Sequence, residues 1–253
     1  MTKAKQMINP KAKQYIIVAL DVEREEEALE LVTELKDYVG FFKVGLELVN
    51  SLGFSIVRKV TDLGGKVFLD LKFMDIPNTV AGASRGATRL GVKMFNVHTL
   101  GGLEMMAAAV DAVNLEASKS TSERPLLLGV TILTSINQPT MNNELRISGS
   151  IENQVVHLAS MASRAGLDGV IASPQELEII RKNIPNKMLI VTPGVRPRWA
   201  AANDQKRVTT PSEAILKGTS HLVIGRPITK PPAEIGSPSQ AAKLVLEEIS
   251  AVL

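Results

Sequence analysis

The stretch "KVFLDLKFMDIPNTVAGASRGATRLG", residues 66–91, contains one complete strand-and-helix unit. Its first eight residues form an apolar run that Asp70 and Lys72 interrupt, and apolar runs of this length are typical of parallel strands that are covered on both faces. Pro77 then opens a helical pattern that continues to Gly91, and proline is favoured at the first position of a helix. The stretch therefore predicts a buried strand, a short loop and a helix.

The same pattern occurs eight times along the chain, and after the second strand the helical pattern covers residues 47–65. The eight apolar runs lie at residues 14–21, 41–45, 66–73, 93–99, 125–133, 168–173, 187–194 and 221–227. Strict alternation of strands and helices predicts a parallel sheet, either doubly wound or closed into a barrel. Eight units in 253 residues favour a single (β/α)8 TIM barrel. The lack of a G-x-G-x-x-G motif after the first run counts against a dinucleotide-binding fold. We expect one barrel domain over residues 15–253, preceded by a basic extension over residues 1–14.

Composition narrows the functional classes. The chain has no cysteine, which excludes disulfides and thiolate metal sites and fits a reducing compartment. No apolar run approaches the roughly 20 residues that a membrane span requires. The lysines of residues 1–14 explain the basic pI, since the remainder is close to neutral. Few aromatic residues are available for base stacking. We expect a cytoplasmic protein that binds neither nucleic acid nor membrane.

Polar residues gather where the predicted strands end, which is where the active site of a TIM barrel lies. These residues are Asp21, Lys43, Asp70, Lys72, Asn96, His98, Thr131, Thr134, Ser135, Ser173, Arg196 and Arg226, and Pro193 and Gly225 lie at the same strand ends. Taken alone, Asp21 is more typical of a helix cap, and a structural ion pair would explain Asp70 and Lys72 equally well. The set as a whole indicates one shared site.

Lys43, Asp70, Lys72 and Asp75 provide two ammonium groups and two carboxylates. On a regular strand Asp70 and Lys72 face the same side, with Cα atoms roughly 7 Å apart. Alternating pairs among the four groups would offset the cost of their desolvation. An ammonium held beside fixed negative charge in a dry pocket can stabilise and then protonate a developing carbanion.

The loops after the last two strands indicate a phosphate site. "TPGVR", "NDQKR" and "VIGRP" place glycine, glutamine and arginine where TIM barrels frequently hold phosphate. Gly225 allows close backbone approach, and Arg226 can bind two phosphate oxygens. Two long connections, residues 134–149 and 193–210, are typical of binding loops or lids. The residues alone therefore predict a phosphorylated small molecule that reacts near Lys72.

At these residues the chain resembles the orotidine 5'-phosphate decarboxylase family, in its bacterial branch. The segments "FKVGLE", "FLDLKFMDIPNT", "NVHTLGG", "VTILTS", "VTPGVRP", "DQKR" and "VIGRPIT" follow the order and spacing of that family. The resemblance implies decarboxylation of orotidine 5'-monophosphate to UMP and CO2 in de novo pyrimidine biosynthesis. It also implies that the enzyme uses no metal and no organic cofactor.

The resemblance further implies a role for each matching residue. Lys72 would donate a proton to C6 of the pyrimidine, and Asp70 would lie near the departing carboxylate. Lys43 and Asp75 would help Asp70 to keep Lys72 charged and aimed. The protein would be a homodimer in which Asp75 and Thr79 serve the partner's site. The implied substrate-binding residues are Asp21 and Lys43 at the ribose, Thr134 and Ser135 at the base, Arg196, Gln205, Gly225 and Arg226 at the phosphate, and Thr79 and Pro193.

Two alternatives remain open at this point. A sugar-phosphate decarboxylase or aldolase of the same barrel suite would use D-x-K-x-x-D to help hold Mg²⁺ and an enediolate. The "IPNT" after Asp75 and the "LTS" at residues 133–135 argue against it. A non-catalytic barrel that binds nucleotide phosphates is the other, since fold alone does not decide function. The charged set of Lys43, Asp70, Lys72 and Asp75 argues against a non-catalytic barrel.

Overall fold

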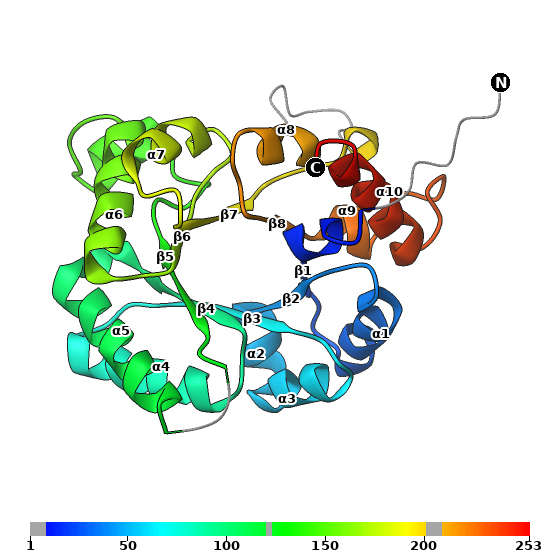
Figure 1. Cartoon of the computed structure of the whole chain (residues 1–253), viewed down its shortest axis with the longest axis horizontal. Helices are drawn as coiled ribbons and strands as arrows, with labels where there is room; N and C mark the ends of the chain where they lie inside the picture. Colours follow the sequence, from blue (N-terminus) through cyan, green and yellow to red (C-terminus); the bar gives the residue numbers. More distant parts are fainter. Residues whose placement is uncertain (1–8, 120–122, 201–208) are drawn as a thin grey trace.

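The computed structural model describes residues 9–119, 123–200 and 209–253. Its strands form a ring and its helices surround them (Figure 1). The strands are β1 (Ile16–Ala19), β2 (Phe41–Gly45), β3 (Val67–Phe73), β4 (Met94–His98), β5 (Leu126–Val130), β6 (Gly169–Ile171), β7 (Leu189–Pro193) and β8 (His221–Ile224). All neighbours pair in parallel, and β8 pairs with β1 to close the barrel. The predicted (β/α)8 TIM barrel is confirmed.

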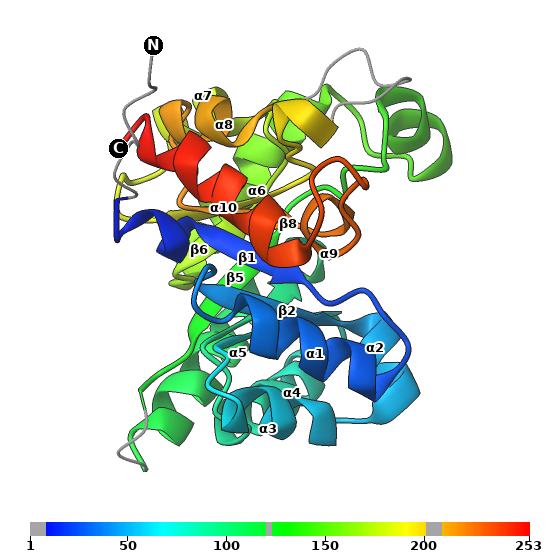
Figure 2. The same ribbon diagram turned by 90° about the vertical axis from the view of Figure 1, so that its right-hand side faces the viewer.

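The helices follow the strands in chain order. They are α1 (Glu25–Leu35), α2 (Leu46–Leu52), α3 (Ser55–Asp62), α4 (Pro77–Arg89), α5 (Gly102–Ala117), α6 (Ile151–Ala165), α7 (Leu177–Asn183), α8 (Pro211–Leu216), α9 (Arg226–Thr229) and α10 (Pro238–Ser250). Short helical turns are η1 (Ala12–Tyr15), η2 (Thr99–Gly101), the π-helical η3 (Thr140–Glu144) and η4 (Arg198–Ala200). As predicted, Pro77 occupies the first turn of α4. Figure 2 shows α10 passing close to β1, and α10 contacts both α8 and α1, which completes the ring of helices.

The helical pattern over residues 47–65 is divided into two helices, α2 and α3. Gly53 ends α2 with φ of 70°, a left-handed conformation that glycine adopts without steric cost. α3 then begins at Ser55 and buries Ile56, Val57 and Val60. Periodicity predicted the helical content here, and the single glycine explains the break.

The apolar core has two parts. Inside the barrel, Phe68, Met94 and Leu128 pack together with Ile17, Ala19, Val191 and Val223. A larger cluster fills the space between the strands and the helices. Such a filled barrel is a packed core rather than a pore, so it fixes the strand ends that carry the polar residues.

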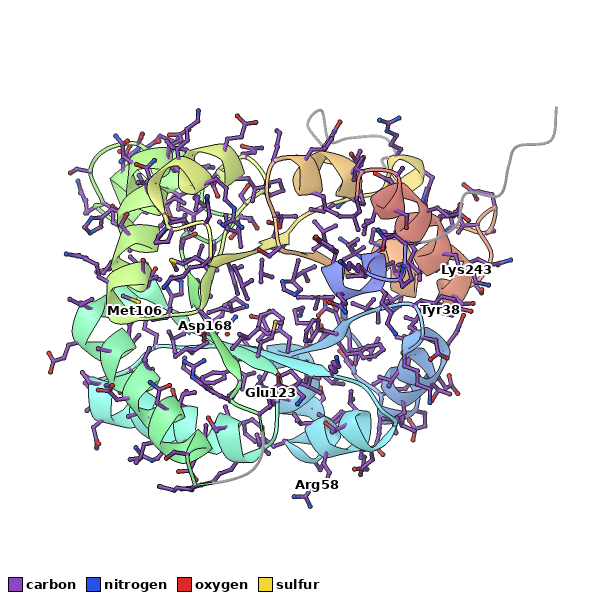
Figure 3. The ribbon with its side chains drawn as sticks, in the orientation of Figure 1. Tyr38, Arg58, Met106, Glu123, Asp168 and Lys243 are labelled. Carbon is purple, nitrogen blue, oxygen red and sulfur yellow. The ribbon has the colours of Figure 1, made fainter. Side chains whose placement is uncertain are left out.

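The chain reaches the barrel before residue 15. Ala12 is fully buried in η1, and the backbone N–H of Asn9 donates to Ser250 Oγ of α10 at 3.0 Å. Residues 9–14 are therefore docked against the fold, while residues 1–8 lie outside the described part. The Nζ atom of Lys243 on α10 lies 5.2 Å from the ring centre of Tyr38. Figure 3 labels both residues, which lie on the same side of the barrel. Among the described residues, no helix is long and apolar enough to cross a membrane.

Candidate active site

Strand β3 is irregular where it carries the charged residues. Its register against β4 shifts between Leu69 and Phe73, and Lys72 has φ of 53°. A left-handed conformation is uncommon for a residue other than glycine, and it is concentrated at functional sites. The relative orientation of the Asp70 and Lys72 side chains therefore does not follow from simple alternation along a regular strand. The two side chains meet nevertheless, since Lys72 Nζ contacts Asp70 Oδ1.

Asp70 lies between two ammonium groups. Its Oδ1 is 2.7 Å from Lys72 Nζ, and its Oδ2 is 3.6 Å from Lys43 Nζ. The Asp70 side chain is only 13% exposed. Burial acts to raise the pKa of Asp70, but the charges of Lys43 and Lys72 and the hydrogen bonds to the carboxylate outweigh burial, so the pKa lies below its usual value. Asp70 is therefore held as a carboxylate next to the Lys72 ammonium.

The second carboxylate of this network is Asp21 rather than Asp75. Asp21 Oδ1 accepts a hydrogen bond from Lys43 Nζ at 2.9 Å, which gives the order Asp21, Lys43, Asp70, Lys72. Asp75 is exposed, and its Oδ1 accepts only the backbone N–H of Ile76 among the described residues. Alternating pairs that include Asp75 are thus wrong for a single chain. The physical reason is that the chain leaves the barrel after Phe73 and turns outward before α4.

Asn96 of β4 is part of the same network, and sequence reasoning placed it at a strand end without giving it a role. Its side chain is fully buried. Its Nδ2 donates to Asp70 Oδ1 at 2.7 Å, and its Oδ1 accepts the backbone N–H of Lys72 at 2.7 Å. His98 lies on the same strand, and burial together with the charge of Lys72 lowers the pKa of its imidazole. His98 is therefore predominantly neutral at pH 7.

A cavity of about 210 Å³ opens beside these charges. Its lining combines the ammonium and carboxylate groups with apolar side chains from β3, β5, β6 and β8. The lining residues are Lys43, Phe68, Asp70, Lys72, Val130, Ile132, Leu133, Thr134, Ile171, Ala172, Pro193 and Val223. Apolar walls exclude water and strengthen electrostatic interactions inside a site. The predicted Thr134 and Pro193 line the cavity, while Ser135 is exposed and is not among the lining residues.

The two predicted arginines line a second cavity of about 390 Å³. Arg196 follows β7 and Arg226 follows β8, and Lys230 and Glu234 also line this cavity. Pro193 and Val223, three residues before each arginine, line the first cavity. The first cavity is thus lined by the ends of β7 and β8, and the second by the segments that follow these strands. Gln205 lies outside the described residues.

Gly225 and Gly45 stand close to the charged groups. A Cβ atom added to Gly225 would come within 3.7 Å of Asp21 Oδ2, which places this glycine beside Asp21. A Cβ atom on Gly45 would come within 3.0 Å of Lys43 Nζ. The second contact is tighter than packed side chains normally allow, so a glycine at position 45 leaves room for the Lys43 ammonium.

Among the described residues, no group of three or more His, Cys, Asp or Glu side chains is arranged to hold a metal ion. The arrangement offers the ammonium groups of Lys43 and Lys72, whose side chains are 12% and 31% exposed, on the wall of a largely apolar cavity, and two arginines on the wall of a second cavity. Such a site can bind an anionic group at the arginines and stabilise negative charge at Lys72.

Comparisons with known proteins agree with this geometry. Residues 14–243 match the model of the orotidine 5'-phosphate decarboxylase / HUMPS family. The orotidine 5'-phosphate decarboxylase of Syntrophomonas wolfei is 50% identical, over 94% of this chain and 98% of the relative. That of Geotalea daltonii is 49% identical, over 97% and 100%. The crystal structure of the Lactobacillus acidophilus enzyme of the same name matches with a TM-score of 0.81 and 38% identity, over 92% of this chain and 98% of the other.

Proposed function

The chain belongs to the orotidine 5'-phosphate decarboxylase / HUMPS family, and from this premise we propose how its residues act on the substrate. The enzyme is a carboxy-lyase that converts orotidine 5'-monophosphate to UMP and CO2 in pyrimidine biosynthesis. The observation that carries the proposal is the Lys43–Asp70–Lys72 group on the wall of the first cavity.

Loss of CO2 from C6 leaves an sp2 carbanion that the pyrimidine ring has no suitable orbital to delocalise. Electrostatic stabilisation must therefore contribute much of the rate enhancement. Lys72 stabilises this charge and then donates a proton to C6, and its contact with Asp70 at 2.7 Å holds the ammonium in place. A donor that is positioned in advance does not need to reorganise during the reaction, which makes it effective in a site that excludes water.

Asp70 and Lys43 hold the proton donor in place. Asp70 lies next to the position of the departing carboxylate, and Lys43 links Asp70 to Asp21. Asp21 and Lys43 bind the ribose hydroxyls, while Thr134 and Ser135 contact the base.

The phosphate binds at the loops that follow β7 and β8. Arg196 and Arg226 line one cavity, which supports a shared role in binding the phosphate oxygens. Gln205 and Gly225 complete this set in the proposal, and Pro193 lies where the phosphate and base ends meet. Binding energy from the remote phosphate can act on the chemical step. Residues 201–208 of the 193–210 loop, predicted from its length to be a binding loop or lid, lie outside the described residues.

We also propose a homodimer in which Asp75 and Thr79 complete the partner's site. Both residues are exposed in the single chain. Around them, Met74 is 54% and Ile76 is 66% exposed, and further exposed leucines follow β2, β4 and β5. Those leucines are Leu46, Leu100, Leu103, Leu133 and Leu145. Exposed apolar side chains at neighbouring strand ends are typical of a protein interface.

Mixing two inactive variants tests this shared site. Lys72→Ala removes the proton donor from its own barrel, and Asp75→Asn removes the carboxylate from the partner's barrel. Equal amounts that exchange subunits freely give about half heterodimers, each with one intact site in two, so about one quarter of wild-type activity should return. No recovery, with heterodimers shown by tagged subunits, would contradict the proposal that Asp75 serves the partner.

The proposed cellular setting is the cytoplasm, with residues 15–253 as the catalytic barrel and residues 1–14 as an extension outside the chemistry. The direct test of the reaction is the fall in absorbance of orotidine 5'-monophosphate on adding purified protein, with EDTA present. We expect rapid loss that EDTA does not slow. Turnover only after Mg²⁺ is added, and only on sugar phosphates, would favour the magnesium-dependent decarboxylases instead. Tight UMP binding without turnover would favour a non-catalytic binding protein.

A further inference from the structure

We infer that Asn96 is the positioning residue that aims Lys72 and holds Asp70 beside it. The inference rests on the proposed role of Lys72 as proton donor. It starts from the register of β3 and β4. Leu69 pairs with Phe95 and Phe73 pairs with Val97, so Asp70, Leu71 and Lys72 all lie opposite the single residue Asn96.

A bulge of this kind leaves backbone groups without their partners in the strand ladder. The Asn96 side chain supplies one such partner, because its Oδ1 accepts the Lys72 N–H at 2.7 Å. The left-handed φ of Lys72 is therefore held by a side chain rather than by the sheet. A buried N–H left without this acceptor would be costly, and the Lys72 backbone would be free to relax.

The other half of the amide binds the carboxylate. Asn96 Nδ2 donates to the same Asp70 Oδ1 that Lys72 Nζ contacts. The orientation of the amide is fixed by chemistry: an ionised carboxylate only accepts hydrogen bonds, and a backbone N–H only donates. Asn96 thus controls both the backbone from which Lys72 projects and the anion that its ammonium contacts.

Asn96 itself lies outside the set of residues that line the cavity, so it acts through its neighbours. Its side chain is fully buried, and β3 provides both of its side-chain hydrogen-bond partners. The side chain at position 96 therefore controls the distance between the Lys72 ammonium and the reacting carbon. A misplacement of about 1 Å can cost about 100-fold in rate.

The test compares Asn96→Ala with Thr219→Val. Thr219 is a buried residue whose hydroxyl is also hydrogen-bonded, but it precedes β8 at the opposite end of the barrel. We expect Asn96→Ala to lower kcat about 100-fold while UMP affinity changes by less than about threefold. Thr219→Val should lose thermal stability and keep the kcat of the wild type.

A pH profile separates positioning from general loosening of the fold. Asp70 is faced by Lys72 on its own strand, Lys43 on β2 and Asn96 on β4, and Asp21 lies beyond Lys43. The hydrogen bond from Asn96 contributes to lowering the pKa of Asp70. In Asn96→Ala the acid limb of kcat, where Asp70 becomes protonated, should move to higher pH, because the carboxylate loses one of the hydrogen bonds that lower its pKa. A purely structural defect would lower kcat without moving that limb.

Asn96→Asp keeps the shape of the side chain, and it tests the same positioning role if the alanine variant does not fold. It retains an acceptor for the Lys72 N–H but places a carboxylate against Asp70. Two carboxylates in contact share a proton, so kcat should fall further as rising pH removes it. Folded variants with kcat within about threefold of wild type and an unmoved profile would overturn the inference. Activity retained by Lys72→Ala would instead overturn the proposed proton donor.

Discussion

Replacing Asp70 with asparagine removes one charge and leaves the shape of the side chain almost unchanged. The substitution acts at the centre of the network, because Asp70 contacts Lys72 Nζ at 2.7 Å and Lys43 Nζ at 3.6 Å. In the variant, two ammonium groups face a neutral amide. Lys43 keeps its contact with Asp21 at 2.9 Å, whereas Lys72 has no other carboxylate within 4.0 Å among the described residues. We therefore expect the substitution to displace the Lys72 ammonium more than the Lys43 ammonium.

The distances set the magnitude. At an effective dielectric constant near 20, the two contacts correspond to gross attractions of about 6 and about 5 kcal/mol. Desolvation of the buried groups cancels much of this attraction, and removing one partner of a buried pair usually costs about 3–5 kcal/mol. Because Asp21 still neutralises Lys43, we expect the lower end of that range. That range refers to folding stability. Because the ammonium that loses its partner is also the group that acts in the transition state, we expect a loss of similar size there, and about 3 kcal/mol is equivalent to at least a 100-fold loss of kcat.

The assay is the decarboxylation of orotidine 5'-monophosphate under saturating substrate, together with thermal unfolding of the same samples. Asp168→Asn is the matched control. Asp168, labelled in Figure 3, precedes β6 and pairs with Arg124 at 2.7 Å, with 26% of its side chain exposed. We expect the control to lose stability and keep kcat. If Asp70→Asn kept kcat within about threefold of wild type, the view that Asp70 holds Lys72 in place would be refuted.

Three further changes test other parts of the molecule. Arg226→Ala should raise KM and also lower kcat, because binding energy from the remote phosphate contributes to the chemical step; steady-state kinetics with an unchanged kcat would count against this. Ile76→Asp should give monomers on size-exclusion chromatography and at least a tenfold loss of activity. The control Leu216→Asp, at a site on α8 that is 71% exposed, should leave the dimer intact. A dimeric Ile76→Asp protein would argue against the proposed interface. The hydrogen bond from Arg89 lowers the pKa of Glu116 to about 2, from an ordinary value of 4.5. The resulting stabilisation is complete above about pH 4.5 and is lost as pH falls toward 2, so the Tm difference between wild type and Glu116→Gln should shrink over that range; a constant difference would contradict the assignment.

The fold was predictable because each strand-and-helix unit is encoded locally. A continuous apolar run and a following helical pattern, as in residues 66–91, need no information from distant residues. Parallel pairing and closure follow once eight such units are counted. The break at Gly53 was less visible, since the helical pattern continues on both sides of it.

The site was predictable in its charged residues but not in their arrangement. Lys43, Asp70 and Lys72 stand out because charges rarely interrupt buried strands. The bulge in β3 depends on its pairing with β4, so no periodicity within one strand reveals it. The role of Asn96 arises from that pairing, across 26 positions to Asp70. The outward position of Asp75 likewise depends on where the chain leaves the barrel.

The most direct measurement for the central claim is turnover of orotidine 5'-monophosphate by Lys72→Ala, with Lys66→Ala as the control. Lys66 is an exposed lysine that directly precedes β3, at the end of the barrel opposite to the cavity. With UMP affinity measured on the same samples, we predict a loss of more than about 1,000-fold in kcat for Lys72→Ala and wild-type kinetics for Lys66→Ala. A folded Lys72→Ala protein that binds UMP normally and turns over within about tenfold of wild type would contradict the assignment of Lys72 as the proton donor.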